Sequence, residues 1–234
     1  MLGKLFGIGV GPGDPDLITL KGYKILREAS LICVPKSKNE ATSLALRIVQ
    51  PHLTKNQTII EVVMPMQEDP EVLSSYWKEA AKTIGSHLSQ GQDVVFLTLG
   101  DPSFYSTYSY LIRSLKEALP EITWETIPGI MSISAAAARA GIALVEGQDK
   151  IAVVARNFDE VELSSILDTF NTVVLMKLTR DFDAVVDLLL KKGLAEQAVL
   201  ITRCGLPGEK ITSDLKTLKG QPIDYFSLLI VKRG

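Results

Sequence analysis

The stretch GIGVGPGDPDLITLKG, residues 7–22, concentrates five glycines and two prolines where a strand-like sequence gives way to a helix-like one. Glycine loops of this kind often bind phosphates through main-chain N–H groups. A dinucleotide fingerprint requires glycines at relative positions one, three and six, but from Gly7 the sixth position is Pro12, and the other registers also fail. Pro12 also lacks the N–H that a phosphate loop would donate. The sequence therefore predicts a rigid loop that some other ligand approaches closely, or a tight turn without a ligand.

Two further loops follow strand-like runs and carry polar groups. In LTLGDPSFYS, Asp101 comes just after an apolar run, where its carboxylate would either cap the next helix or accept hydrogen bonds from a ligand. In TIPGIMSISAAAARAG, the turn at residues 129–132 opens a helix of small residues. Main-chain groups at such a helix start suit a polar ligand, whereas the alanines themselves favour close helix packing.

Composition excludes several classes of protein. The 234 residues are 46% hydrophobic and 22% charged, with a net charge of -2, which is not the profile of a general nucleic-acid binder. The two cysteines, Cys33 and Cys204, lie far apart, and both histidines lie in polar stretches, so no protein-bound metal is expected. No run approaches 18 apolar residues, and the opening MLGKLFG is too short for a signal peptide, so we expect a cytoplasmic protein that does not enter membranes.

The loops need a scaffold, and the apolar runs indicate one. KLFGIGV, SLICVP, TIIEVV and DVVFLTL read as strands, mostly short and continuously apolar, as in a parallel sheet covered on both faces. Residues 71–90 read as a helix between two of them. A second helical face is formed by apolar residues at helical spacing, namely Tyr108, Leu111, Ile112, Leu115 and Leu119.

The second half of the chain repeats this alternation with ITWETIP, IAVVA, TVVLMK and AVLITR, and then ends in an apparent antiparallel ribbon. The sequence thus predicts two tandem α/β domains, 1–119 with a mostly parallel sheet and 120–234 with a mixed sheet. Tandem α/β domains normally leave a ligand cleft between them, with strand ends supplying the contacts.

Together these stretches resemble one family. VGPGDPDLITLKG, LGDPSFYS, IPGIMSISAAAA, VVLMK and ITRCGLPGEKI occur in the order typical of the tetrapyrrole methylases, the class III S-adenosylmethionine-dependent methyltransferases. Within the family, GDPSFYSTYSYL, SISAAAARAGIALVEGQDK and VVLMKLTRDF are most similar to the C-20 methyltransferases that act on precorrin-2 or cobalt-factor II in cobalamin biosynthesis. Adenosylmethionine has no phosphate, which agrees with the failed phosphate spacings.

The resemblance implies a folded cofactor bound between the domains, largely by main-chain groups. Carried onto this sequence, the implied cofactor contacts are Pro12, Leu99, Gly100, Asp101, Phe104, Met131, Ser132, Met176, Gly205, Leu206, Ser227 and Leu228. It also implies a homodimer and a tetrapyrrole substrate that either lacks a metal or carries its own cobalt.

The chemistry of the implied reaction points to further residues. The sulfonium methyl is electrophilic and a tetrapyrrole meso carbon is nucleophilic, so alignment of the reacting atoms is the main requirement. Tyr105 and Asp14 are candidate bases for the proton released after transfer, while Tyr108 reads as core. The many carboxylates of the substrate call for cations, for which the candidates are Lys36, Arg139, Lys177 and Arg203.

Two other functions stay open at this point. An enzyme of the same fold could methylate another acceptor, as a diphthine synthase or an rRNA ribose methylase does, although the slightly acidic composition disfavours RNA. A binding module could instead hold the tetrapyrrole or adenosylmethionine without turnover, because no base is strongly indicated.

Overall fold

The computed structural model divides the chain into two compact units, Met1–Met131 and Ser132–Gly234. It describes residues 1–37, 42–65, 70–155 and 158–233. The division falls later than the expected boundary between residues 119 and 120. The reason is strand pairing, because residues Thr123–Ile127 pair with the first strand of the chain and so belong to the N-terminal unit.

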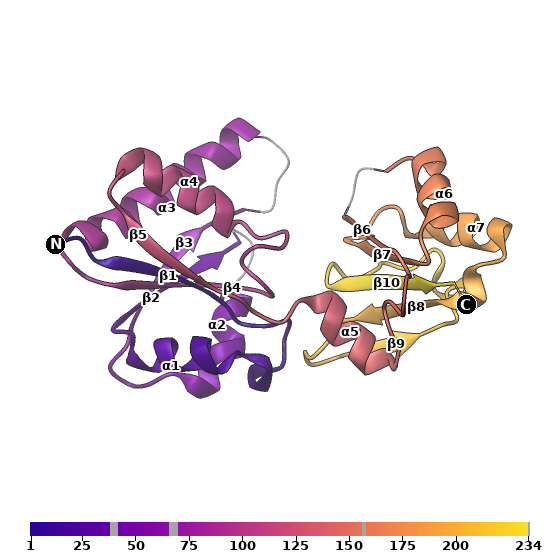
Figure 1. The fold of residues 1–234 in the computed structure, drawn as a ribbon, viewed down its shortest axis with the longest axis horizontal. Coiled ribbons are helices and arrows are strands. Elements are labelled where there is room, and N and C mark those ends of the chain that lie inside the picture. Colours follow the sequence, from indigo (N-terminus) through magenta and orange to yellow (C-terminus); the bar gives the residue numbers. More distant parts are fainter. Residues whose placement is uncertain (38–41, 66–69, 156–157, 234) are drawn as a thin grey trace. The chain divides into compact units, whose positions relative to one another are not determined.

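The N-terminal unit is an α/β layer structure around a parallel five-stranded sheet, with strand order β3-β2-β4-β1-β5. The strands are β1 (Lys4–Gly9), β2 (Leu31–Lys36), β3 (Thr58–Val63), β4 (Val94–Thr98) and β5 (Thr123–Ile127). The helices are α1 (Leu20–Glu28), α2 (Leu44–Val49), α3 (Pro70–Ser89) and α4 (Tyr108–Ala118). Figure 1 shows α1 and α2 on one face of the sheet and α3 and α4 on the other. The continuously apolar strands fit this two-sided cover.

The core of the N-terminal unit lies between the sheet and the pair α3 and α4. Phe96 on β4 and Leu5 on β1 are fully buried there, against Ile84 on α3 and Leu115 on α4. Tyr108 is buried in the same cluster, as its place on the helical stripe predicted. Burial raises the pKa of Tyr108, while a hydrogen bond with the Thr126 hydroxyl lowers it by a smaller amount.

The C-terminal unit is built on a mixed sheet with strand order β6-β7-β10-β8-β9. The strands are β6 (Ile151–Ala155), β7 (Thr172–Met176), β8 (Ala198–Thr202), β9 (Lys210–Thr212) and β10 (Ser227–Lys232). The helices are α5 (Ser132–Ala140), α6 (Glu160–Thr169) and α7 (Phe182–Lys192). The apolar stripe of α7 is buried with the core-facing residues of the sheet, and Gly193 ends the helix in the left-handed conformation.

The expected antiparallel ending is present, but its strands pair differently. β9 and β10 both pair antiparallel with β8 and not with each other. β10 also pairs antiparallel with β7, so the last strand of the chain lies inside the sheet. The start of β10 therefore lies beside the ends of β7 and β8.

Candidate functional site

In the N-terminal unit, the loops after β1 and β4 are joined by main-chain hydrogen bonds. Gly11 and Gly100 form an isolated antiparallel bridge, in which the Gly100 N–H donates to the Gly11 carbonyl at 2.9 Å. Just before it, the Val10 N–H donates to the Thr98 carbonyl at 3.0 Å. The GPGDP and GDP stretches, far apart in sequence, thus form one structure at the carboxyl end of the sheet.

Three glycines, which we call the glycine junction, let the main chains of these loops touch. They are Gly9, Gly100 and Gly129. A Cβ on Gly129 would lie 2.1 Å from the Gly100 carbonyl oxygen, and one on Gly9 would lie 2.5 Å from the same atom. Gly100 has a left-handed φ of 68°, and a Cβ there would meet no atom within 4 Å. The junction therefore packs main chain against main chain and leaves one side of Gly100 open.

Asp101 ties the junction together. It is 8% exposed, and its Oδ2 accepts from the Gly129 N–H at 2.9 Å. Its Oδ1 accepts from the Ser103 N–H at 2.8 Å and from the Ser103 hydroxyl. Burial alone would raise the pKa of Asp101, but these three hydrogen bonds outweigh it and hold the pKa below its ordinary value of 3.8.

Asp101 is therefore not the cap of the following helix, which was one of its two expected roles. The N-cap of α4 is Thr107, and the Asp101 carboxylate is used instead to connect the ends of β4 and β5. The Gly129 N–H, expected to be available at a helix start, is its partner. Sequence reasoning missed Ser103, although an Asp in a loop commonly accepts from the N–H two residues further on, in an Asx turn.

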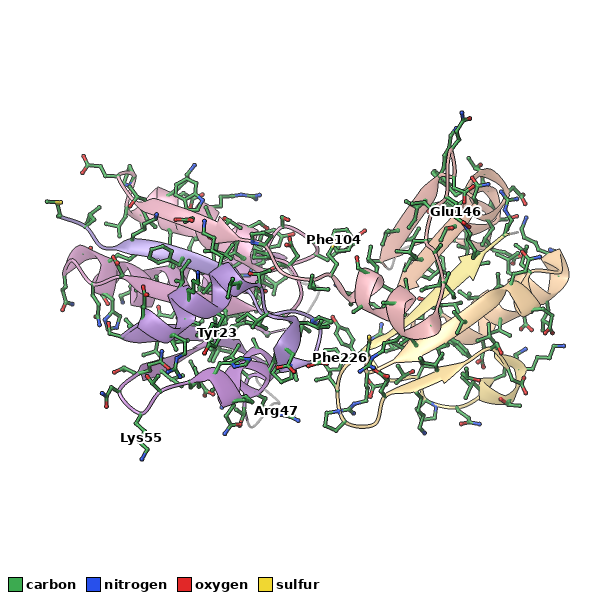
Figure 2. All side chains as sticks on the ribbon, turned by 60° about the horizontal axis from the view of Figure 1, so that its bottom comes forward. Tyr23, Arg47, Lys55, Phe104, Glu146 and Phe226 are labelled. Carbon is green, nitrogen blue, oxygen red and sulfur yellow. The ribbon has the colours of Figure 1, made fainter. Side chains whose placement is uncertain are left out.

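The other expected residues of the N-terminal unit lie around this junction. Pro12 is buried and Leu99 is half-buried, next to the bridge. Phe104 lies on the loop after β4, labelled in Figure 2, and packs edge-on against Tyr105 with ring centroids 4.8 Å apart. Tyr105 is 53% exposed and has a left-handed φ of 49°.

Two expected residues already have partners within the unit. Asp14 accepts from the Asp16 N–H at 3.0 Å and caps the short 3-10 helix at Pro15–Leu17. Lys36, at the end of β2, pairs with Glu61 on β3 at 3.0 Å. Met131 is half-buried at the end of the unit.

In the C-terminal unit, several of the expected cofactor residues lie at one end of the three central strands, β7, β10 and β8. Leu228 pairs with Met176, and Ser227 pairs with Thr202. The hydroxyls of Ser227 and Thr202 lie 2.9 Å apart. At this end of the sheet, the carboxyl ends of β7 and β8 lie beside the start of β10. The helix α5, which begins at the half-buried Ser132, packs against β8 and β10.

The loop after β8 is held by a second carboxylate. Glu209 Oε2 accepts from the Gly205 N–H at 2.6 Å and lies 3.5 Å from Arg139 Nε at the end of α5. Gly205 has a left-handed φ of 72°, and the Leu206 N–H donates to the Arg203 carbonyl at 2.8 Å. The Gly205 N–H, an expected cofactor donor, is thus engaged by Glu209, and Arg139 is part of the same cluster.

Two of the expected cationic residues share an uncommon backbone conformation. Lys177 and Arg203 directly follow β7 and β8 and have left-handed φ values of 61° and 55°. A residue with a side chain pays for this conformation, and such residues concentrate at functional sites. Arg203 also pairs with Asp224 at 3.2 Å. Neither Glu209 nor Asp224 was identified from the sequence.

Across the described ranges, no group of three or more His, Cys, Asp and Glu side chains is arranged to hold a metal ion. In the same parts of the chain, no helix has the length and apolar character needed to span a membrane.

Comparison with solved structures identifies the fold as that of tetrapyrrole methyltransferases. A cobalt precorrin-4 methyltransferase superposes with a TM-score of 0.71 at 22% identity, covering 98% of this chain and 94% of that chain. The uroporphyrin-III C-methyl transferase from Thermus thermophilus, complexed with S-adenyl homocysteine, superposes with a TM-score of 0.68 at 20% identity, covering 98% and 97%.

Sequence comparison gives the family directly. The model described as Tetrapyrrole (Corrin/Porphyrin) Methylases matches residues 4–219, and the chain belongs to this family of methyltransferases. The cobalt-precorrin-2 C(20)-methyltransferase of Salmonella typhimurium is 33% identical to it, over 100% of this chain and 98% of that protein. The precorrin-2 C(20)-methyltransferase of Sinorhizobium sp is 30% identical, over 98% and 95%.

Proposed function

We propose that this protein transfers a methyl group from S-adenosylmethionine to C-20 of a precorrin-2-type tetrapyrrole, cobalt-bearing or metal-free, in cobalamin biosynthesis. The observation that carries the proposal is similarity over nearly the whole of both chains to relatives named for this reaction. The Salmonella typhimurium relative is named for the cobalt-bearing ring, and the Sinorhizobium relative for precorrin-2.

The strand-end loops fit a donor of this kind. Adenosylmethionine supplies an electrophilic methyl group on a positively charged sulfur. The open side of Gly100 offers main-chain groups where no side chain intervenes, and the loop is rigid because Asp101 holds it. We propose that the cofactor contacts implied by the resemblance serve this role, with Asp101 and Glu209 fixing the loops that carry them. A rigid site favours methyl transfer because alignment of the reacting atoms is its main demand.

For the carboxylates of the ring, Lys177 and Arg203 are the better candidates among the four expected cations. Both follow strands directly, and both hold strained backbone conformations. We propose Lys177 and Arg203 as the principal carboxylate-binding residues.

Methyl transfer to a meso carbon leaves one proton to be removed. We propose that Tyr105, in preference to Asp14, takes this proton on its hydroxyl oxygen while its own O–H proton passes to solvent, because the side chain of Tyr105 is exposed on the loop after β4. Asp14 already uses its carboxylate to cap a turn. Tyr105→Phe should therefore slow turnover more than Asp14→Asn, with adenosylmethionine affinity retained in both.

The experiment that tests the function is turnover with methyl-labelled adenosylmethionine. We expect a product one methyl heavier, with the carbon-13 label on the meso carbon between the first and last rings. Cobalt-bearing and metal-free rings supplied in parallel would separate the two substrates. A label on a pyrrole carbon would contradict the C-20 assignment, and a label on protein or RNA would contradict the substrate class. Binding of adenosylmethionine without any turnover would contradict an enzymatic function and favour the alternative, a binding module.

We propose further that the protein acts as a cytoplasmic homodimer without nucleic-acid or membrane partners and without a protein-bound metal. The net charge of -2 and the family resemblance support this organisation. Light scattering would then give twice the chain mass of 25.5 kDa.

A further inference from the structure

Arg203 is held firmly by main-chain contacts at the end of β8. Its N–H donates to the Phe226 carbonyl at 2.8 Å, and its carbonyl accepts from the Leu206 N–H at 2.8 Å. Phe226, labelled in Figure 2, lies on the segment that leads into β10. Together with the left-handed φ of 55°, these bonds fix the direction in which the side chain leaves the backbone.

The guanidinium of Arg203 is only partly satisfied. Its Nη1 donates to Asp224 Oδ2 at 3.2 Å. Its Nε is buried and has no hydrogen-bond partner among the residues that the structure describes. A buried donor without an acceptor is costly, and the cost is larger when the donor carries charge. An unpaired Nε in an otherwise anchored side chain therefore points to a missing acceptor.

The geometry of the guanidinium group indicates which kind of acceptor would fit. The Nε–H and one N–H of Nη2 point in the same direction and form an edge that matches the two oxygens of a carboxylate. Asp224 bonds Nη1, on the opposite side of the group, and so does not occupy this edge. The pair with Asp224 thus leaves the carboxylate-binding edge of Arg203 in place.

Asp224 is itself well oriented. Its Oδ1 accepts from the Phe226 N–H at 2.8 Å, and its carbonyl accepts from the Ser227 N–H at 3.2 Å. The side chains of Arg203 and Asp224 are 38% and 29% exposed, and ion pairs this exposed contribute little to folding. The contact is therefore better explained by orientation of the arginine than by stabilisation of the fold.

From this geometry we infer that Asp224 is a positioning residue, which holds Arg203 so that its Nε–Nη2 edge binds one carboxylate of the tetrapyrrole side chains in a bidentate manner. This inference rests on the proposed function, because the ring supplies the carboxylate. It adds a residue that acts through Arg203 and touches neither the cofactor nor the reacting carbon.

The test compares four full-length variants with the wild type by titration of the precorrin-2-type ring and of adenosylmethionine. Asp224→Ala should weaken ring binding about tenfold, as loss of one charged hydrogen-bonded contact does, and change adenosylmethionine binding by less than about twofold. Asp224→Asn keeps an acceptor oxygen and should lose less than about threefold. Arg203→Lys keeps the charge but not the fork, and should match Asp224→Ala. The matched control is Asp187→Ala, which removes the exposed partner of Lys219 in the same unit and should change neither affinity.

Two additional measurements separate positioning from a structural role. In the Arg203→Lys background, Asp224→Ala should add less than about twofold, because both changes remove the same interaction. A ring with its carboxylates methyl-esterified should bind equally well to the wild type and to Asp224→Ala. If Asp224→Ala does not fold, Asp224→Asn on the free-acid and esterified rings makes the same comparison, with the smaller loss expected only on the free-acid ring.

The outcomes are distinct. Equal binding of the free-acid ring by the wild type and Asp224→Ala overturns the inference alone, as does an effect that persists in the Arg203→Lys background or on the esterified ring. Failure of the wild type to bind the ring contradicts the proposed function and, with it, this inference.

Discussion

At the scale of single residues, Asp101 is the clearest target. All three of its hydrogen bonds are received from N–H or O–H donors on Ser103 and Gly129. Asp101→Asn would direct an amide N–H group at one of these donors, and we expect it to lower the free energy of unfolding by about 1–3 kcal/mol at pH 7. Adenosylmethionine affinity should fall in parallel, because the loops of the glycine junction lose their connection. Urea unfolding and calorimetric titration measure the two effects.

The pH dependence of this variant has a definite sign. The pKa of Asp101 is depressed in the folded protein, so its ionised form contributes stability above the ordinary value of 3.8. That contribution disappears as the pH falls through the folded pKa. The difference between wild type and Asp101→Asn should therefore shrink in acid. Glu117→Gln, which removes an exposed carboxylate from α4, should change stability by less than about 0.5 kcal/mol. A difference that stays constant down to pH 3 would contradict this role.

The sequence predicts some of these residues and not others, for a physical reason. Lys177 and Arg203 stand out because they directly follow apolar strands, and Asp101 because it lies three residues after one. Glu209 and Asp224 do not, because a surface loop with an acidic residue looks the same whether or not its carboxylate has a partner. Asp224 lies 21 residues from Arg203 in sequence, and only the pairing of β8 with β10 brings them together.

At the scale of elements, the glycine junction sets a steric limit. We expect Gly129→Ala to destabilise the protein by more than about 1 kcal/mol, because its Cβ would lie 2.1 Å from a carbonyl oxygen of the main chain, which cannot move alone. The matched control is Gly85→Ala on α3, where the Cβ would meet only side-chain atoms, the nearest being the ends of Leu119 at 3.2 Å and Leu115 at 3.8 Å. There we expect a neutral or stabilising change, since alanine favours a helix. Urea unfolding of both variants makes the comparison, and equal stabilities would contradict it.

The positions of the strands were easier to predict than the order in which the strands pair. The apolar runs located the strands well, because a buried strand must be apolar on both faces. The same pattern does not say which strand lies beside which. ITWETIP was assigned to the second domain for this reason, although β5 pairs with β1 in the first unit. The antiparallel ending of the mixed sheet was likewise predicted without its strand order, in which β10 lies between β7 and β8.

At the scale of the whole molecule, the unit boundary can be tested by dissection. A fragment of residues 1–131 contains every strand of the first sheet and should unfold cooperatively in urea. A fragment of residues 1–119 lacks β5, and it also lacks Gly129, whose N–H donates to Asp101. We expect the shorter fragment to show no cooperative transition by circular dichroism. Equal unfolding midpoints for the two fragments would place the boundary at the earlier position after all.

The sheet order also has a consequence for synthesis of the chain. β1 leaves the ribosome well before its neighbours β4 and β5, which follow some 90–120 residues later. At roughly 5–20 residues per second, this apolar strand waits on the order of ten seconds for a partner, while β2 and β3 can already pair. An unpaired apolar strand readily joins the wrong edge or another nascent chain. β1 is therefore exposed to aggregation during translation, and a chaperone that shields this strand should raise the yield of the protein.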